Sequence, residues 1–492
     1  MAAAVFTLCA CSKDESDPPL AAGDVAVDVV LTPRGFEDQI YTSYLYMIPF
    51  VTDYQGVNVE GLLTKDIFKL SLVSPRSGAT IELKMHESEL NEEVVGQYTL
   101  PRSGDTLWMQ PRMVWKYDAL RRFDRTRNLA LRWTISADGR EICTVDRTFS
   151  CRSVSQCVNA LIVYPYERPQ GLVVNEDDAV EIPEMFTGYV EEENPEIDRI
   201  MEQALQEVAL PLGFNGYQSG DENYLFQQMC AIWYVLQQTG VSYSNATQIP
   251  GQAEDVRVQN VRFFSQALAS AQANCVEGTC MLASIYQRFD LFPYLILKPN
   301  HMFLGIGDAN GDLTYFLETT MIGNVRLDAL ATAEEKWEAS KANFKNAMAV
   351  AKEEFDEVKS RVDAGDPYYA VIDLKEARKT IPSMLARSSM MSRVVPAMSE
   401  TMARSSLSRR LSKVLFPTFG APTMATATPS LMALPSENEL RRASIRSLIC
   451  RMVSRSWVRS ANSTSSSEKS SSSSSSEVRC SSFSRRVSNA AE

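Results

Sequence analysis

With 492 residues, 45% of them apolar, the chain is long enough for two or three globular domains with buried cores. Its net charge of −12 argues against nucleic acid as a partner, and its ten cysteines are too few for a disulfide-based scaffold. The only histidines are His86 and His301, and Cys275 and Cys280 lie farther apart than a usual zinc-binding pair, so we expect no metal and no other cofactor.

Residues 1–21 are similar to the end of a lipoprotein signal. Leu8, Ala10 and Cys11 match a lipobox, in which a small residue precedes the lipidated cysteine. The acidic SKDES after Cys11 resembles the export tag of some surface-displayed Gram-negative lipoproteins. We therefore expect an exported protein at the outer membrane or cell surface, attached to the membrane through a lipid on Cys11. The alternative is an unstructured N-terminus with a chance cysteine.

Residues 22–165 predict an antiparallel β-sandwich. Apolar residues alternate with polar ones in 25–31 and 129–135, as in strands with one buried face. Several further short strands separated by turn signals are typical of a sandwich, and we expect them near 67–73, 79–85, 94–99 and 106–117. In an exported protein three cysteines of this part could form disulfides, namely Cys143, Cys151 and Cys157.

Residues 166–195 form an acidic run, which is typical of a solvated linker. At its end, Asn194 and Pro195 have the residue types that are favoured at a helix cap and at the first helical position. A second helix is expected from about residue 222 to 238, because Gly240 provides a helix stop. These helices begin a second domain, which we expect to end near residue 380.

The residues from 274 onward predict a helix with a reactive cysteine at its start. Asn274 is a favoured N-cap residue, and Glu277 completes a capping box three positions later. Cys275 is then the first helical residue, where unpaired N–H groups and the helix dipole favour a thiolate. Gly278 lies on the same side of the helix and leaves space beside the sulfur.

A hairpin that carries a histidine and a carboxylate is expected next. After a short buried strand, His301 begins a second strand, and residues 308–311 are a hairpin-turn signal. With a four-residue turn, His301 lies opposite Glu318 on the same face of the returning strand. With a two-residue turn at 310–311, His301 lies opposite Thr320, and Glu318 is diagonal but within reach.

These residues together indicate nucleophilic catalysis. Cys275 would attack, His301 would hold and move the proton, and Glu318 would orient the imidazole ring. The developing oxyanion needs donors, for which the Cys275 N–H and the Gln259 side chain are candidates. Structural alternatives exist, because a lone cysteine or histidine is usually a packed core residue, and Gln259 and Arg262 could form ordinary structural bonds. The joint arrangement favours the catalytic interpretation.

The same residues resemble a known family. A cysteine on a helix, a histidine on a strand and an acid on the next strand follow the order of the transglutaminase-like cysteine superfamily. QNVRFFSQALASAQANCVEGTCMLASI, KPNHMFLGIG and YFLETT look like its bacterial branch, which has Q-x-V-R before N-C and H-x-F-x-G after it. The resemblance covers residues 196–380 and implies a papain-like core with Cys275 as nucleophile, His301 as base and Glu318 as orienting acid. Many members have Asp at the third position, and some members have lost activity. Known activities are peptide-bond cleavage, amide transfer and deamidation.

A long amphipathic helix is expected from about residue 333 to 361. Its apolar stripe consists of Trp337, Phe344, Met348, Phe355 and Val358. The strand-like sequence YYAVIDL at 368–374 follows and is expected at a sheet edge, where it ends the second domain.

Residues 381–492 differ sharply in composition from the rest of the chain. They contain 16 Lys and Arg against 6 Asp and Glu, which gives +10 and leaves −22 for residues 1–380. They are rich in Ser, Arg and Met, and such a low-complexity tract does not bury enough surface to fold. One hypothesis is a frameshift near residue 380, and the alternative is a native, basic, disordered tail.

The sequence therefore predicts an α+β protein, in which an N-terminal antiparallel β-sandwich is followed by a papain-like or transglutaminase-like α+β domain and a disordered tail. We expect a cysteine-dependent amide or peptide hydrolase or acyl transferase that acts on a peptide or protein. The alternative is an inactive surface lipoprotein that binds peptide or glycan. The sequence predicts no oligomeric state.

Overall fold

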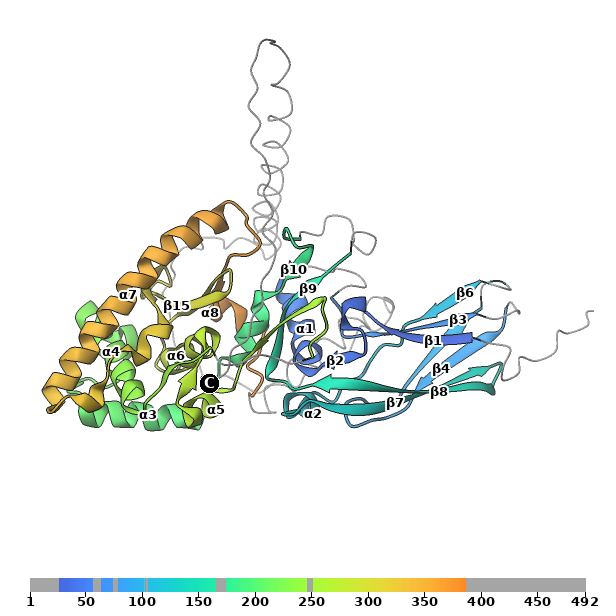
Figure 1. Cartoon of the computed structure of the whole chain (residues 1–492), viewed down its shortest axis with the longest axis horizontal. Helices are drawn as coiled ribbons and strands as arrows, with labels where there is room; N and C mark the ends of the chain where they lie inside the picture. Colours follow the sequence, from blue (N-terminus) through green and yellow to red (C-terminus); the bar gives the residue numbers. More distant parts are fainter. Residues whose placement is uncertain are drawn as a thin grey trace, which may run out of the picture. The chain divides into compact units, whose positions relative to one another are not determined.

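The computed structural model describes the chain in seven segments, which are residues 26–55, 63–73, 78–100, 102, 105–164, 174–245 and 251–385. All of them belong to one compact unit, Met1–Leu407. The described chain is a mixed α+β structure, with several sheets and with most of its helices in the second half (Figure 1). The expected lipidation site at Cys11 lies outside the described residues.

Two sheets form the N-terminal part. The larger has the order β2-β8-β7-β4-β5, with bounds Gln39–Tyr41, Arg140–Arg152, Arg127–Ala137, Thr80–Met85 and Val94–Thr99. The smaller has the order β1-β3-β6, with bounds Ala26–Leu31, Phe68–Val73 and Thr106–Met109. Neighbouring strands are antiparallel except β2 and β8, which are parallel.

The two sheets meet through aromatic side chains on their buried faces. Along β7, Trp133 is buried and its neighbour Arg132 is exposed, as the alternating sequence predicts. The ring of Phe68 on β3 lies 5.3 Å from that of Trp133 and 5.6 Å from that of Phe149 on β8, measured between ring centroids. The strands predicted near 67–73, 79–85 and 94–99 are confirmed as β3, β4 and β5.

Two elements of this part differ from the prediction. The strand expected near 106–117 ends at Met109, and a short helix, α2 (Tyr117–Arg121), follows it. Helix α1 (Thr42–Gln55) was not predicted from the sequence. It is buried on nearly all sides, so its sequence has no amphipathic period, and it is rich in strand-forming Tyr, Val and Ile.

A third sheet includes strands from both predicted domains. It has the order β10-β9-β12, with bounds Ala179–Glu181, Gln156–Ile162 and Val256–Asn260. The prediction of a solvated linker over 166–195 is therefore wrong for its described part, which contains β10 and the 3-10 helix η3 (Pro183–Tyr189). The reason is that apolar residues between the acids are buried, among them Val180, Met185 and Tyr189.

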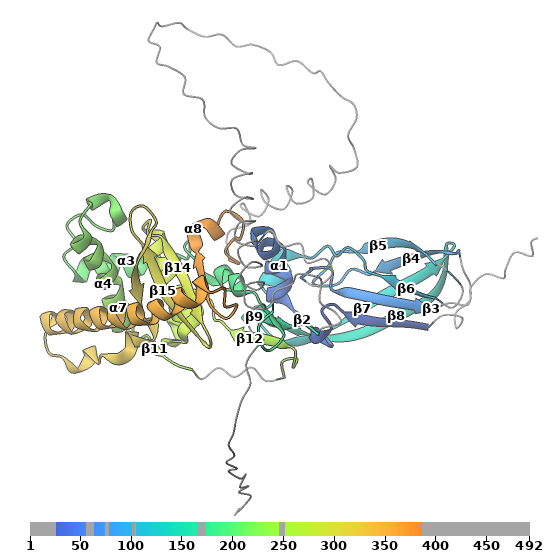
Figure 2. The ribbon, with the colours of Figure 1, turned by 90° about the horizontal axis from the view of Figure 1, so that it is seen from above.

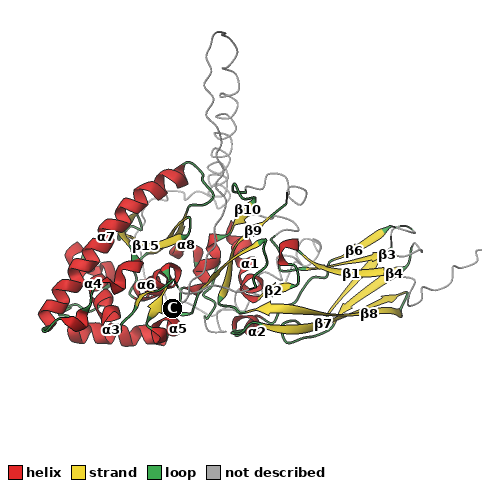
Figure 3. Ribbon diagram, viewed as in Figure 1, coloured by secondary structure: helices red, strands yellow, loops and turns green. Residues whose placement is uncertain are grey.

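The C-terminal part is organised around a four-stranded sheet with the order β16-β15-β14-β17. The bounds of these strands are Leu313–Leu317, His301–Gly307, Pro293–Lys298 and Ala370–Asp373. Most of the helices lie in this part of the chain (Figure 3). They are α3 (Pro195–Glu207), α4 (Glu222–Gln238), α5 (Phe264–Ser270), α6 (Cys275–Arg288), α7 (Ala333–Asp363) and α8 (Leu374–Ala377). Of these, α6, α7 and α8 contact the strands of the sheet.

Several predictions for this part are confirmed. Helix α3 begins at Pro195 with Asn194 as its cap, and α4 spans the predicted residues. The long helix α7 packs on β16, β14 and β17 and lies beside this sheet in Figure 2, and Phe344 and Val358 of its predicted stripe are buried. Strand β17 is an edge strand, as expected.

The fold continues past the predicted boundary at residue 380. Ile381 and Met384 are fully buried, and the Met384 N–H donates to the carbonyl of Gly188 over 2.8 Å. Packing therefore continues for a few residues into the segment whose composition differs from the rest of the chain. The rest of the predicted tail, from residue 386, lies outside the described residues.

Cys143, Cys151 and Cys157 are free thiols in the structure, so the disulfides considered for them are not formed. Cys143 is half-buried, whereas Cys151 and Cys157 are buried. Within the described segments, no helix combines the length and the apolar character that a bilayer crossing needs.

Candidate active site

Cys275 is the first residue of α6, as the sequence predicts. The N–H of Glu277 donates to Asn274 Oδ1, and the N–H of Asn274 donates to Glu277 Oε2, each over 2.9 Å. This capping box satisfies two of the backbone donors at the helix start. Cys275 is half-buried, so its sulfur is both held by the fold and open to solvent.

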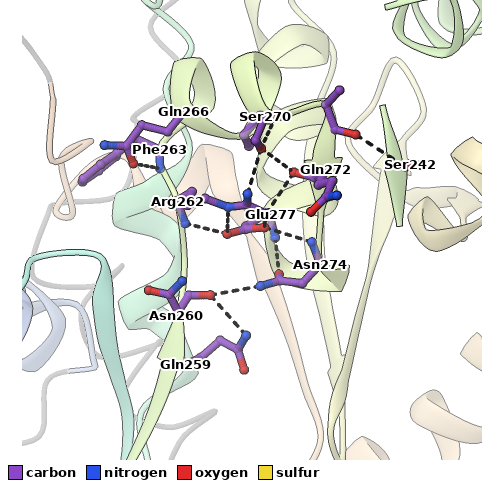
Figure 4. Close-up of polar contacts among 12 residues, drawn as sticks. Ser242, Gln259, Asn260, Arg262, Phe263, Gln266, Ser270, Gln272, Asn274 and Glu277 are labelled. Atoms are coloured by element: carbon purple, nitrogen blue, oxygen red, sulfur yellow. Dashed lines mark hydrogen bonds and ion pairs between the residues drawn. The ribbon is translucent and has the colours of Figure 1, made fainter. Parts of the chain in front are cut away.

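The capping box is held by a buried ion pair. The Glu277 carboxylate has no exposed side-chain surface, and Arg262 donates to both of its oxygens, over 2.9 Å from Nε and 2.8 Å from Nη2. The Arg262 backbone N–H donates to the same carboxylate over 2.8 Å. Figure 4 shows Glu277 at the centre of these bonds, between Arg262 and Asn274. The structural alternative for Arg262 is confirmed, because it fixes the helix that carries the cysteine.

Away from its turn, the hairpin after α6 has the second of the two expected registers, but its turn is neither of those expected, because Gly307 pairs with Leu313. Leu304 pairs with Leu317 on β16, and continuing this register leads from His301 to Thr320. The register with His301 directly opposite Glu318 is therefore wrong. The turn is organised by the Asp308 carboxylate, which accepts from the N–H groups of Asn310 and Asp312, and a bulge at Ile306 and Gly307 precedes it.

Glu318 nevertheless reaches His301. It lies just after β16, and its Oε2 is 2.7 Å from His301 Nε2. Its other oxygen accepts from Thr320, over 2.9 Å from the N–H and 2.5 Å from Oγ1. The Glu318 N–H donates to the carbonyl of Ala347 on α7 over 3.1 Å. The carboxylate is only 3% exposed, so both of its oxygens are held in a fixed geometry.

Cys275 and His301 line the same cleft, and Cys275 is one of the groups that raise the pKa of the imidazole. Since Nε2 faces Glu318, Nδ1 is the ring nitrogen that remains for the sulfur. Burial alone would lower the pKa of His301, but the interactions with Cys275 and Glu318 outweigh burial and raise this pKa to about 10. Burial opposes ionisation of Glu318, yet the bond to His301 and the charge of His301 lower the pKa of Glu318. Both shifts favour a protonated imidazole next to an ionised carboxylate.

Helix α6 is brought to the histidine strand by contacts along one of its sides. Thr279 Oγ1 donates to the carbonyl of Met302, the residue after His301, over 3.3 Å. The side chain of Thr319 fills the space that Gly278 leaves open, since a Cβ there would lie 3.2 Å from Thr319 Oγ1. The small residue therefore allows the segment after Glu318, rather than a substrate, to approach the helix.

Cys275 and His301 line a cleft of about 570 Å³. A cleft of this size is within the range of ligand-binding sites in proteins. Gln259 lines the same cleft, where its amide nitrogen lies 3.2 Å from the carbonyl of Asn260. The Asn274 side chain donates to that same carbonyl over 3.0 Å, and Figure 4 shows the pair of contacts. Gln259 thus lines the cleft and also makes a structural hydrogen bond of the kind that the alternative interpretation expected.

A polar network on the third sheet contributes further residues to the cleft. Arg257 on β12 contacts Asp177 and Glu181, and its Nη1 is 3.3 Å from Glu181 Oε1. Tyr368, which precedes β17, donates its hydroxyl to Asp177 Oδ2 over 3.0 Å. Burial raises the pKa of Glu181, although the charge of Arg257 and a bond from Asn175 oppose the shift. These groups satisfy one another and make this side of the cleft polar.

Two residues near Cys275, His301 and Glu318 were not identified from the sequence. Glu354 on α7 places Oε2 3.6 Å from His301 Nε2. Tyr243 on β11 (Ser242–Tyr243), which pairs in parallel with β13 (Gln272–Ala273), is 43% exposed. Burial and then the charges of Cys275 and Glu318 raise its pKa, which places it near both groups. Of these two residues, only Glu354 has a signal in the sequence. It lies three residues after Ala351 and four before Val358, and this helical spacing places it on the same side of α7 as these two buried residues.

One group of side chains has the geometry to hold a metal ion among the residues that the structure describes. His301, Glu318 and Glu354 each offer one ligand atom, and these atoms lie within 4.8 Å of one another. Two of them already share a hydrogen bond of 2.7 Å, so we assign the three groups to a network around His301 and not to a metal ion.

Comparisons of the chain with models of protein families, with curated proteins and with solved structures found no match.

The buried ion pair of Glu277 can be tested by its effect on stability. We expect Glu277→Gln to lower the free energy of unfolding by about 3 kcal/mol, because it leaves Arg262 without its charge partner in a largely buried site. Urea denaturation followed by circular dichroism measures the change.

The chain offers a matched control in α7. Glu335 has the same place in a capping box with Thr332, but it is exposed and has no arginine partner there. Glu335→Gln should therefore change the stability little. Equal effects of the two substitutions would contradict the structural role assigned to the ion pair.

Proposed function

We propose that this protein is a cysteine-dependent amide hydrolase or acyl transferase of the transglutaminase-like type. The observation that carries the proposal is that Cys275 and His301 line one cleft and act on each other electrostatically, while Glu318 lies 2.7 Å from the His301 ring. A nucleophile, a base that can hold its proton and an acid that orients the base are the components of such a reaction. The substrate we propose is a peptide or protein, bound without a cofactor.

The fold supports this proposal. Helix α6 begins with the nucleophile and contacts β15, which begins with the histidine, and this is the arrangement expected of a papain-like core. The two N-terminal sheets with their shared aromatic core support the interpretation of that part as a β-sandwich. We further propose that the protein is exported and attached to the membrane through a lipid on Cys11, which would keep the cleft outside the cell.

In the first half of the proposed reaction, the Cys275 sulfur attacks the carbonyl carbon of the scissile amide. The backbone N–H of Cys275 and the Gln259 amide would donate to the oxyanion that forms. His301 gives its proton to the leaving nitrogen as the C–N bond breaks, which leaves a thioester on Cys275 and a free amine. Glu318 keeps the ring in place and stabilises its positive charge before this transfer.

In the second half, an acceptor attacks the thioester carbon. His301, now neutral, removes a proton from the acceptor, and the C–S bond breaks to restore the sulfur and the imidazolium. With water as the acceptor the outcome is hydrolysis, and with an amine it is transfer to a new amide. The cleft is open enough for either acceptor, since it has a volume of about 570 Å³ with Cys275 half-buried on its surface.

The proposal predicts an unusually reactive Cys275. Iodoacetamide should alkylate Cys275 at least about tenfold faster than Cys143 at pH 7, because an imidazolium next to the sulfur favours the thiolate. Cys143 is the matched control, since it is also half-buried but burial and Glu141 raise its pKa. Peptide mass spectrometry over time gives both rates. His301→Ala should remove the difference.

Equal labelling of Cys275 and Cys143 in the folded protein would favour the alternative function, an inactive surface protein that binds peptide or glycan. Cys275→Ala should then leave its ligand binding intact. In the proposed enzyme, the same substitution should abolish amide turnover without loss of stability.

The protonation of His301 gives a second prediction. Its raised pKa of about 10 means that the imidazolium is present at neutral pH and is lost as the pH rises through about 10. Glu318→Gln removes one of the groups that raise this pKa, so the imidazolium is lost at a lower pH. We expect alkylation of Cys275 at pH 7 to be about tenfold slower in this variant. An unchanged rate and pH profile would exclude Glu318 as the acid of the triad.

A further inference from the structure

A second carboxylate faces the histidine of the proposed triad. Glu354 Oε2 lies 3.6 Å from His301 Nε2, on the same ring nitrogen that contacts Glu318. The Glu354 side chain is 25% exposed, and its Oε2 atom is shielded from solvent. Among the described residues this oxygen has no hydrogen bond of good geometry, so its charge is balanced by nearby cations rather than by fixed donors.

Helix α7 places Glu354 there through its packing on the sheet. Ala351 and Val358 on the same side of the helix are fully buried, and Phe355 stacks on Phe316 of β16 with ring centroids 4.1 Å apart. Helix α7 contacts β16, β14 and β17, and Figure 2 shows it beside this sheet. A carboxylate on the packed side of an amphipathic helix costs stability unless it has a partner, so its position calls for an explanation.

The second partner of Glu354 is a lysine next to the histidine. Lys298 on β14 pairs with His301 across the β14–β15 ladder, and its Nζ lies 3.1 Å from Glu354 Oε2. The side chain of Lys298 is 22% exposed. Glu354 is thus shared between an ammonium and an imidazole, which compete for one carboxylate oxygen.

We propose that Glu354 is a second acidic partner of His301, shared with Lys298, and that it acts as a positioning residue which holds the protonated ring toward Cys275. This role rests on the proposed function of Cys275. Glu318 orients the ring by a direct bond, and Glu354 adds negative charge from a separate element, α7. Because α7 also binds the Glu318 backbone through the Ala347 carbonyl, one helix positions both carboxylates.

The other charged and titratable groups around His301 come from four elements. They are Cys275 on α6, Glu318 after β16, Lys298 on β14 and Tyr243 on β11. The remaining charges of the cleft, Asp177, Glu181 and Arg257, contact one another on the third sheet. Glu354 and Lys298 are therefore the pair whose removal tests this role without disturbing the triad itself.

The two partners have opposite effects on the imidazolium. Glu354→Gln removes an attraction, so His301 should lose its proton at a lower pH than in the wild type. Lys298→Gln removes a repulsion and frees Glu354 for His301, so the proton should be lost at a higher pH. Opposite shifts show that both charges act on the ring, and the alkylation rate of Cys275 reports whether the ring is held toward the sulfur.

The test uses the full chain with its histidines labelled with carbon-13. Only two imidazole signals are expected, and His86→Gln assigns them. The ring of His301 is titrated in the wild type, Glu354→Gln, Lys298→Gln and the control Glu353→Gln, which removes an exposed carboxylate one residue away. We expect a lower midpoint for Glu354→Gln, a higher one for Lys298→Gln and no change for the control. Alkylation of Cys275 at pH 7 should be about fivefold slower in Glu354→Gln.

The inference is overturned if Glu354→Gln and Glu353→Gln give the same midpoint, or if both members of the Lys298–Glu354 pair shift it in the same direction. Failure of the proposed function has a different signature. In that case wild-type Cys275 reacts no faster than Cys143, whatever the His301 midpoints of the variants are.

Discussion

The burial of the Glu277 carboxylate is the constraint on which the candidate site depends. A buried charge is tolerated only with a partner of opposite charge and with hydrogen bonds, and Arg262 and Asn274 supply both. Arg262 follows strand β12 of the third sheet, whereas Glu277 is in the first turn of α6. Satisfying this one carboxylate therefore fixes the start of α6 against β12, and with it the sulfur of Cys275.

The histidine is fixed by a different set of interactions. Strand β15 places His301 beside the start of α6, and the segment after β16 places Glu318 at its ring. Helix α7 then binds the Glu318 backbone and adds Glu354. Cys275 and His301 thus come from separately stabilised pieces of structure, which meet at a cleft that also contains Gln259. Such a division keeps the reactive groups rigid while one side of the sulfur stays open.

The sequence predicted the features that depend on neighbouring residues. Asn274 and Glu277 form a capping box that can be recognised in the sequence, so the position of Cys275 at the helix start could be predicted. The features that were missed depend on tertiary structure. Helix α1 is buried on nearly all sides, so its apolar residues show no helical period. The buried apolar residues of 174–195 are interspersed with acidic ones, so this segment has the composition of a solvated linker. The hairpin register depends on a bulge at Gly307, and Glu354 reaches His301 only after α7 packs on the sheet.

The most direct test of the central claim is covalent capture of Cys275 by a peptide vinyl sulfone, with the modified residue identified by mass spectrometry. This reagent needs a thiolate to attack it and a proton donor to complete the addition, so it reports Cys275 and His301 together. We predict one adduct, on Cys275, in the folded protein, and its loss in His301→Ala. Folded wild-type protein without an adduct on Cys275, or with equal modification in His301→Ala, would contradict the central claim.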